Sequence, residues 1–116
     1  MKKNSSITVI IPALNEGKRL SYAVNTVLRA VKKRFSVYEI LIFDDGSTDK
    51  TGEIADSLAS GNNNIKVIHH NKPTCTGRVY KEGLKLSKMD YVILVNGKGD
   101  ITENELDKIL SLCGQA

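Results

Sequence analysis

Four short apolar runs, separated by stretches of helical pattern, constrain what this chain can fold into more than any other feature of its sequence. The runs span residues 7–14, 38–43, 65–68 and 91–95, and each is rich in Ile, Val or Tyr, which is typical of strands. The first, second and fourth are almost continuously apolar, as strands covered on both faces are. The third contains Lys66 and is followed by two histidines, which suits a strand at the edge of a sheet.

Helical patterns lie between and after these runs. Apolar residues recur at helical spacing in three segments, at residues 20–31, 54–59 and 79–87. A fourth helix is predicted near the end of the chain, where Thr102 and Glu105 have the spacing of a capping box and Gly114 is expected to end the helix.

Strand and helix therefore alternate four times along the chain. Alternation of this kind predicts an α/β fold with a parallel sheet and right-handed crossovers. We expect a Rossmann-like sheet of strand order 3-2-1-4 with helices on both faces. The 116 residues are expected to form one domain, because neither a linker nor a repeat interrupts the pattern.

Composition and charge favour a soluble cytoplasmic protein. No apolar run approaches the about 20 residues of a membrane-spanning helix, and no signal-peptide core is present. The two cysteines lack metal-ligand spacing and are expected to be free thiols. Part of the net charge of +4 comes from Arg29, Lys32, Lys33 and Arg34. We interpret these cations as complementing a helix dipole, in preference to a lipid or nucleic-acid surface, because no aromatic residues or glycines are interspersed among them.

Polar residues follow the first two predicted strands. Ligands of open parallel sheets bind outside the carboxyl ends of the strands, near the point where the strand order reverses. Asn15 and Glu16 follow the first strand, where they could cap a helix and favour its positive end, or border a ligand. Asp44 and Asp45 follow the second strand, where they could be solvated, or could accept hydrogen bonds from a nucleobase or a ribose hydroxyl.

The two motifs together carry a family resemblance. The segments IIPALNE at residues 10–16 and FDDGSTD at residues 43–49 closely resemble the family 2 glycosyltransferases of the GT-A fold. Within that family the chain looks most like the branch of dolichyl-phosphate mannose synthases and bacterial polyprenyl-phosphate sugar transferases. The resemblance covers nearly the whole chain and implies the nucleotide-binding half of such an enzyme.

The resemblance implies a donor, an acceptor and a set of binding residues. The donor would be a UDP- or GDP-sugar. The acceptor would be a polyprenyl phosphate at the membrane surface or another molecule; we expect no nucleic-acid partner and leave a homo-oligomer open. Asp45 would accept from N3–H of uracil or its counterpart in guanine, and Asp44 would support it. The full set of implied nucleotide-binding positions is Pro12, Asn15, Glu16, Asp44, Asp45, Gly77, Arg78, Asn96 and Lys98.

The chain departs from the family pattern after the fourth strand. The family places a DxD motif there, whose carboxylates hold Mg²⁺ or Mn²⁺ against the pyrophosphate. Asn96 and Lys98 occupy the two acidic positions, and Asp100, two residues further on, is the remaining candidate metal ligand. We expect the Lys98 ammonium to replace the charge of the metal, with Gly97 and Gly99 allowing the backbone to approach the phosphates and offer N–H donors to them. The alternative is a decayed loop in which Lys98 points into solvent.

Other expectations limit the function. Family members carry the general base for the acceptor in a following half, so these 116 residues alone are not expected to transfer sugar. A non-catalytic nucleotide-sugar binding module is therefore the alternative to an enzyme fragment. A nucleotidyltransferase or flavodoxin-like domain is disfavoured, because no glycine-rich phosphate loop follows the first strand. His69 and His70 should point to opposite faces of the sheet, which is poor geometry for shared metal ligation, so we interpret them as structural or surface residues.

Overall fold

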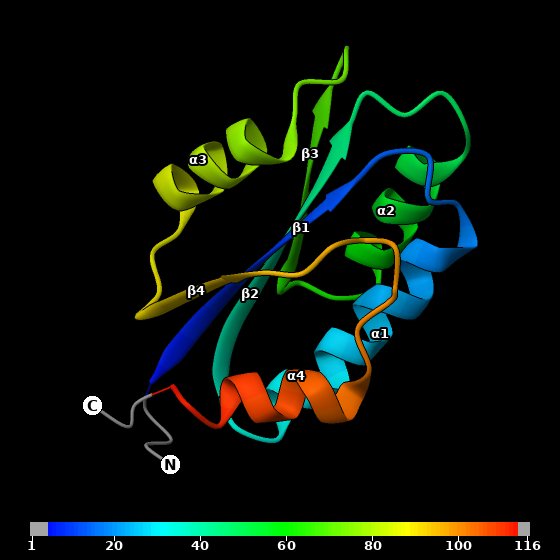
Figure 1. The fold of residues 1–116 in the computed structure, drawn as a ribbon. Helices are drawn as coiled ribbons and strands as arrows, with labels where there is room; N and C mark the ends of the chain where they lie inside the picture. Colours follow the sequence, from blue (N-terminus) through cyan, green and yellow to red (C-terminus); the bar gives the residue numbers. More distant parts are fainter. Residues whose placement is uncertain (1–4, 114–116) are drawn as a thin grey trace.

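Four parallel strands form the centre of the protein (Figure 1). The computed structural model describes residues 5–113; the predicted helix end at Gly114 lies outside them. The strands are β1 (Ser6–Ala13), β2 (Val37–Asp45), β3 (Ile65–His70) and β4 (Tyr91–Leu94), in the order β3-β2-β1-β4. The predicted strand order 3-2-1-4 is confirmed.

Within residues 5–113, four helices cover the two faces of this sheet. They are α1 (Lys18–Lys32), α2 (Thr51–Ser60), α3 (Thr76–Leu86) and α4 (Glu103–Leu110). Figure 1 shows α3 on one side of the sheet and α1, α2 and α4 on the other. The capping box at the start of α4 is confirmed, since Thr102 Oγ1 accepts from Glu105 N at 3.1 Å and Glu105 Oε1 accepts from Thr102 N at 2.9 Å.

Side-chain alternation along β1 divides the core into two unequal parts. Val9 and Ile11 pack in the larger part, under α1, α2 and α4. Ile10 points the other way and packs with Val79 of α3 in the smaller part. A Cβ atom on Gly83 would lie 2.5 Å from Ile10 Cδ1, so glycine lets α3 approach β1 closely. Of the described helices, α3 is the one on this face, so the smaller part of the core has a thinner covering (Figure 1).

The two outer strands are less buried than the inner two. The expectation that both faces of β4 are covered is confirmed, because Tyr91 and Ile93 pack in the larger part of the core and Val92 and Leu94 in the smaller part. All four residues of β4 are nevertheless only half-buried. The reason is its position, because β4 is an edge strand that pairs with β1 alone. The predicted edge position of β3 is confirmed.

Cations at the end of α1 hold α4 in place. Arg29 and Lys33 each contact Glu103 at 2.8 Å, and Arg34 contacts Asp107 at 2.9 Å. The interpretation of these cations as partners of the helix dipole is therefore incomplete, because they also form ion pairs with α4, which packs beside α1. Within residues 5–113, no helix combines the length and apolar character that crossing a membrane requires.

Candidate active site

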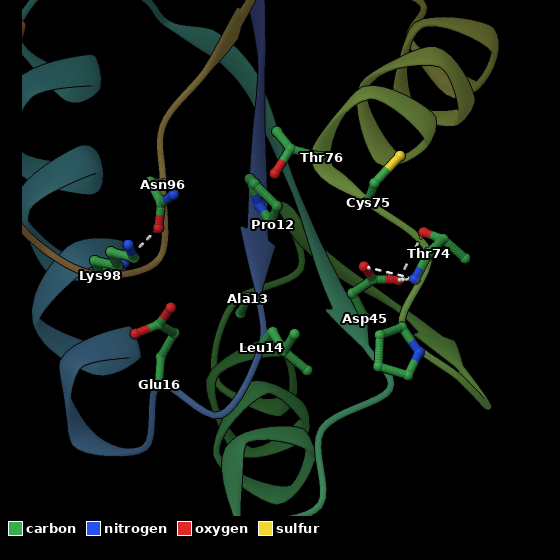
Figure 2. A pocket seen from close by; sticks show the side chains of 11 residues that line it. Pro12, Ala13, Leu14, Glu16, Asp45, Thr74, Cys75, Thr76, Asn96 and Lys98 are labelled. Carbon is green, nitrogen blue, oxygen red and sulfur yellow. Dashed lines mark hydrogen bonds between the residues drawn. The ribbon is translucent and has the colours of Figure 1, made fainter.

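A cavity of about 320 Å³ lies at the carboxyl ends of the strands (Figure 2). It is bounded by the end of β1, the end of β2, the loop from β3 to α3 and the loop after β4. The residues around it are Pro12, Ala13, Leu14, Glu16, Asp45, Pro73, Thr74, Cys75, Thr76, Asn96 and Lys98. Five of the sequence-predicted residues thus meet in one cavity, namely Pro12, Glu16, Asp45, Asn96 and Lys98.

Asp45 is a buried, multiply hydrogen-bonded polar group of this cavity. Its residue is 6% exposed, and it receives hydrogen bonds from His70 Nδ1 (2.7 Å), Thr74 Oγ1 (2.8 Å) and Thr74 N (3.0 and 3.1 Å to the two oxygens). Burial raises the pKa of the Asp45 carboxyl, but the hydrogen bonds from His70 and Thr74 outweigh it and hold that pKa below its usual range. The cavity therefore contains a fixed, ionised carboxylate.

His70 connects Asp45 to helix α3. Its Nδ1 faces Asp45 at 2.7 Å and its Nε2 faces Glu82 Oε1 at 2.9 Å. The hydrogen bond to Asp45 raises the pKa of His70 most; burial opposes this, and Glu82 adds to it. We call Asp45, His70 and Glu82 the α3-side cluster. The ring of Phe43 packs against His70 at a centroid distance of 5.9 Å, so the imidazole is held on three sides.

A second cluster, again a histidine between two carboxylates, lies on the opposite face of the sheet. His69 Nδ1 faces Asp44 Oδ2 and His69 Nε2 faces Asp56 Oδ1 of α2, both at 2.8 Å. We call Asp44, His69 and Asp56 the α2-side cluster. Asp44 also accepts from Ser47 N at 3.1 Å, is 7% exposed and does not line the cavity.

The parallel register explains both clusters. Asp44 pairs with His69 and Asp45 pairs with His70 across β2 and β3, and adjacent strand residues point to opposite faces. The prediction that the two histidines point apart is confirmed. The sequence analysis does not predict the contacts of the histidines with the two aspartates. The sequence did contain a signal for these contacts, because two adjacent acids end the second strand and two adjacent histidines end the third.

The loop after β4 continues along β1. Gly97 N donates to the carbonyl oxygen of Pro12 at 3.0 Å, and a Cβ atom on Gly97 would lie 2.9 Å from that oxygen. This glycine therefore brings the loop close to β1, which corrects the expectation that its N–H is open to phosphates. Gly99 has a φ of 74° and packs beside Tyr22. Asn96 Oδ1 accepts from Lys98 N at 2.9 Å, which orders the turn that carries Lys98 at the cavity (Figure 2).

Asn15 connects two loops and does not cap α1. The helix begins after Gly17 without a side-chain cap, so the capping expectation is wrong. Asn15 has a φ of 53°, and its Oδ1 accepts from Thr48 N at 2.8 Å and Asp49 N at 3.3 Å. It lies outside the cavity lining, as do Gly77 and Arg78, which border a neighbouring cavity of about 510 Å³ with Lys81, Glu82 and Lys85 of α3.

Comparison with known proteins places this geometry in a family. The family model described as glycosyl transferase family 2 matches residues 8–112. The chain belongs to glycosyltransferase family 2. The GlyG glycosyltransferase of Streptococcus pneumoniae is 30% identical over 103 residues, which are 89% of this chain and 33% of that protein. Human dolichyl-phosphate beta-glucosyltransferase is 26% identical over 110 residues, covering 89% of this chain and 34% of that enzyme. This chain thus spans about a third of the curated relatives that it matches.

Solved structures of similar fold support the GT-A architecture. S. aureus TarS 1–349 in complex with UDP-GlcNAc superimposes with a TM-score of 0.73 at 22% identity, over 95% of this chain and 31% of TarS 1–349. The mannosyltransferase PcManGT of Pyrobaculum calidifontis, solved with GDP-Man and Mn²⁺, gives a TM-score of 0.70 at 15% identity, over 82% of this chain and 28% of PcManGT. At these identities the likeness shows the fold, and the predicted GT-A architecture is confirmed.

The residues of this site do not suit the divalent metal that a GT-A neighbour binds. Residues 5–113 hold no group of three or more His, Cys, Asp or Glu side chains that could bind a metal ion. Asp100 is exposed and does not line the cavity, while an amide and an ammonium, Asn96 and Lys98, do. Since an ammonium repels a divalent cation, we derive no step through a metal.

Proposed function

We propose that this chain forms the nucleotide-binding part of a glycosyltransferase, whose cavity takes the nucleoside diphosphate of a UDP- or GDP-sugar. The observation that carries the proposal is Asp45, an ionised and almost buried carboxylate at the carboxyl end of β2 that lines the cavity. A carboxylate held in this way accepts a hydrogen bond from an N–H group of a nucleobase. The base would therefore lie beside Asp45, between the ends of β1 and β2 and the loop that follows β3.

Lys98 is proposed to bind the diphosphate in place of a metal ion. It lines the same cavity as Asp45 but comes from the loop after β4, beyond the end of β1. Because Gly97 N is engaged by Pro12, that N–H cannot serve the phosphates, and the attraction rests on the Lys98 ammonium. Glu16 borders the cavity with a side chain only 8% exposed, and Arg19 at 3.6 Å offsets part of its negative charge.

The sugar acceptor is proposed from the relatives alone. Several relatives are named for a dolichyl-phosphate acceptor, and we propose a polyprenyl phosphate at the membrane surface as the acceptor class. Transfer is expected to need a general base from the part of the enzyme that this chain does not match. The second candidate, a binding module without catalysis, is favoured by Asn96 and Lys98 at the positions where the family carries its metal-binding acids.

Calorimetric titration of UDP and GDP into the protein tests nucleotide binding. Asp45→Ala is expected to weaken binding by about 1.5–3 kcal/mol, or roughly ten- to hundredfold in Kd, because a hydrogen bond to a charged acceptor is lost. Asp56→Ala, which changes the α2-side cluster, is the matched control and should leave Kd unchanged. Equal affinities of the wild type and Asp45→Ala would remove Asp45 from the site.

The same titration separates metal-dependent from metal-independent binding. With EDTA present, the wild type should bind a nucleoside diphosphate and Lys98→Ala should bind it more weakly, with a smaller dependence on salt concentration. A requirement for Mn²⁺, or an unchanged affinity in Lys98→Ala, would contradict the role of Lys98. A labelled-donor assay with a polyprenyl phosphate distinguishes the two candidate functions. Transfer of sugar by a protein that joins this chain to the remaining part of a family 2 enzyme would support the glycosyltransferase, and binding without transfer would support the binding module.

A further inference from the structure

The two oxygens of Asp45 are unequal, and this inequality bears on which base the cavity accepts. Oδ1 receives hydrogen bonds from His70 Nδ1 at 2.7 Å, Thr74 Oγ1 at 2.8 Å and Thr74 N at 3.1 Å. Among residues 5–113, Oδ2 receives only the shared N–H of Thr74, at 3.0 Å. Since each carboxylate oxygen has about two acceptor sites, Oδ1 is saturated and Oδ2 can accept one more donor.

His70 cannot release Oδ1 without breaking other contacts. Its second nitrogen faces Glu82 at 2.9 Å, and the ring of Phe43 packs against it. Both ring nitrogens therefore face carboxylate oxygens, and both donate when the imidazole is protonated. The His70 side chain is 17% exposed, so few water molecules can replace these partners.

The four common bases present different donor patterns to a carboxylate. Uracil offers one imide N–H between two carbonyl groups, whereas guanine offers two neighbouring donors, N1–H and its 2-amino group. A carboxylate satisfies both guanine donors only if both of its oxygens are available, as in bidentate pairing. Adenine and cytosine place an unprotonated ring nitrogen beside their amino group, and that lone pair repels the second carboxylate oxygen.

We propose that His70 and Thr74 are specificity-determining residues, which saturate one oxygen of Asp45 so that the cavity selects a uracil nucleotide over a guanine nucleotide. This inference rests on the proposed nucleotide-binding function. The two similar solved structures contain donors with different bases, uracil in UDP-GlcNAc and guanine in GDP-Man. The fold alone therefore does not decide between a uracil and a guanine nucleotide. In this chain a bound guanine would leave its 2-amino group opposite a saturated oxygen, and a desolvated donor without an acceptor weakens binding.

The experiment compares UDP, GDP and inosine diphosphate by calorimetric titration of residues 1–116. Inosine diphosphate is as large as GDP but lacks the 2-amino group, so its comparison with GDP separates hydrogen bonding from size. The wild type should bind UDP and inosine diphosphate about tenfold more tightly than GDP. In His70→Leu and in Thr74→Val the preference for inosine diphosphate over GDP should fall to within about threefold. The shared N–H of Thr74 can settle on Oδ2, so Oδ1 keeps a single donor in either variant and regains an acceptor site.

Two further variants make the result specific to the α3-side cluster. His70→Asn keeps an N–H donor near Nδ1 and should restore the wild-type preference. His69→Leu removes the equivalent ring from the α2-side cluster and should leave the preference unchanged. Thr74 lies in an exposed loop, so Thr74→Val tests the inference even if His70→Leu does not fold.

The outcomes separate this inference from the proposal on which it rests. Equal binding of inosine diphosphate and GDP by the wild type, or a preference unchanged in His70→Leu and Thr74→Val, overturns the selection mechanism while nucleotide binding stands. Failure of all three nucleotides to bind the wild type overturns the nucleotide-binding proposal and the inference together.

Discussion

The α2-side and α3-side clusters contain the same kinds of residue but differ in what surrounds them. His69 lies between Asp44 and Asp56 with its side chain 44% exposed, and neither it nor Asp44 lines the cavity. His70 lies between Asp45 and Glu82 with its side chain 17% exposed, and its partner Asp45 lines the cavity. Two adjacent acids in the sequence thus enter different environments, because adjacent strand residues face opposite sides of the sheet.

Because of this difference, we infer a structural role for the α2-side cluster and a role in binding for the α3-side cluster. The α2-side cluster ties the end of β3 to a helix on the face with the larger core. The α3-side cluster lies on the face with a single helix and orients a carboxylate toward the cavity. We therefore expect changes in the first cluster to affect stability alone, and changes in the second to affect both stability and nucleotide affinity.

The largest effect is expected from Gly46→Ala, beside the α3-side cluster. Gly46 has a φ of 82°, and a Cβ atom would lie 2.5 Å from the carbonyl carbon of Lys72 and from Pro73 N. The left-handed backbone and the displaced loop together should reduce the free energy of unfolding by roughly 2–4 kcal/mol. UDP affinity should also fall, because this loop carries Thr74. Urea unfolding followed by circular dichroism, together with calorimetry, measures both quantities.

Gly52→Ala is the matched variant beside the α2-side cluster. Its Cβ atom would lie 2.6 Å from Asp44 Oδ2 and 3.4 Å from His69 Cε1. The higher helix propensity of Ala offsets part of the steric cost, which leaves a net loss of roughly 1 kcal/mol. UDP affinity should be unchanged. A loss of affinity equal to that of Gly46→Ala would contradict the separation of the two clusters.

An intermediate effect is expected from pH. The pKa values of His69 and His70 are raised above the ordinary 6.5, chiefly by hydrogen bonds to Asp44 and Asp45, with Asp56 and Glu82 on the second ring nitrogens. A raised pKa in the folded state means that the stabilisation is complete below pH 6.5 and is lost as pH rises through the raised values. The free energy of unfolding should therefore fall over that range.

Single histidine variants divide this pH dependence between the clusters. His70→Leu should remove more of it than His69→Leu, because the His70 side chain is less exposed and its ion pairs are less screened by water. Chemical unfolding at a series of pH values measures the slope for each variant. Identical slopes for the wild type and both variants would show that neither histidine changes its protonation on folding.

The smallest effect is expected at Glu103, which lies outside both clusters. Its contacts with Arg29 and Lys33 at 2.8 Å join α1 to α4 at the surface, where water and salt weaken ion pairs. Glu103→Gln should change stability less than any change in the clusters, and high salt should abolish the difference from the wild type. Thermal unfolding at low and high salt checks this expectation.

Much of the fold and part of the site could be predicted from local patterns. The strand order was predicted from the apolar runs and their spacing. The motifs after the first two strands, together with the loop after the fourth, predicted that Pro12, Asp45 and Asn96 lie together at the carboxyl ends of the strands. The capping box at Thr102 was equally local, because both of its hydrogen bonds span three residues. Helix capping was a local alternative for Asn15, and the structure excludes it, since the partners of Asn15 are Thr48 and Asp49, more than 30 residues away.

Local patterns were therefore enough to predict the alternation of strands and helices, the order of the sheet and the positions of the carboxylates at the carboxyl ends of its strands. These features follow from periodicity and from residues close together in the chain. The different surroundings of the two aspartates depend on long-range contacts: Asp44 joins a structural cluster, while Asp45 faces the cavity and is held by His70 and Thr74. These contacts require the correct strand register, because two strands must pair before residues 25 or 29 positions apart can share hydrogen bonds, and that pairing depends on the packing of the whole sheet.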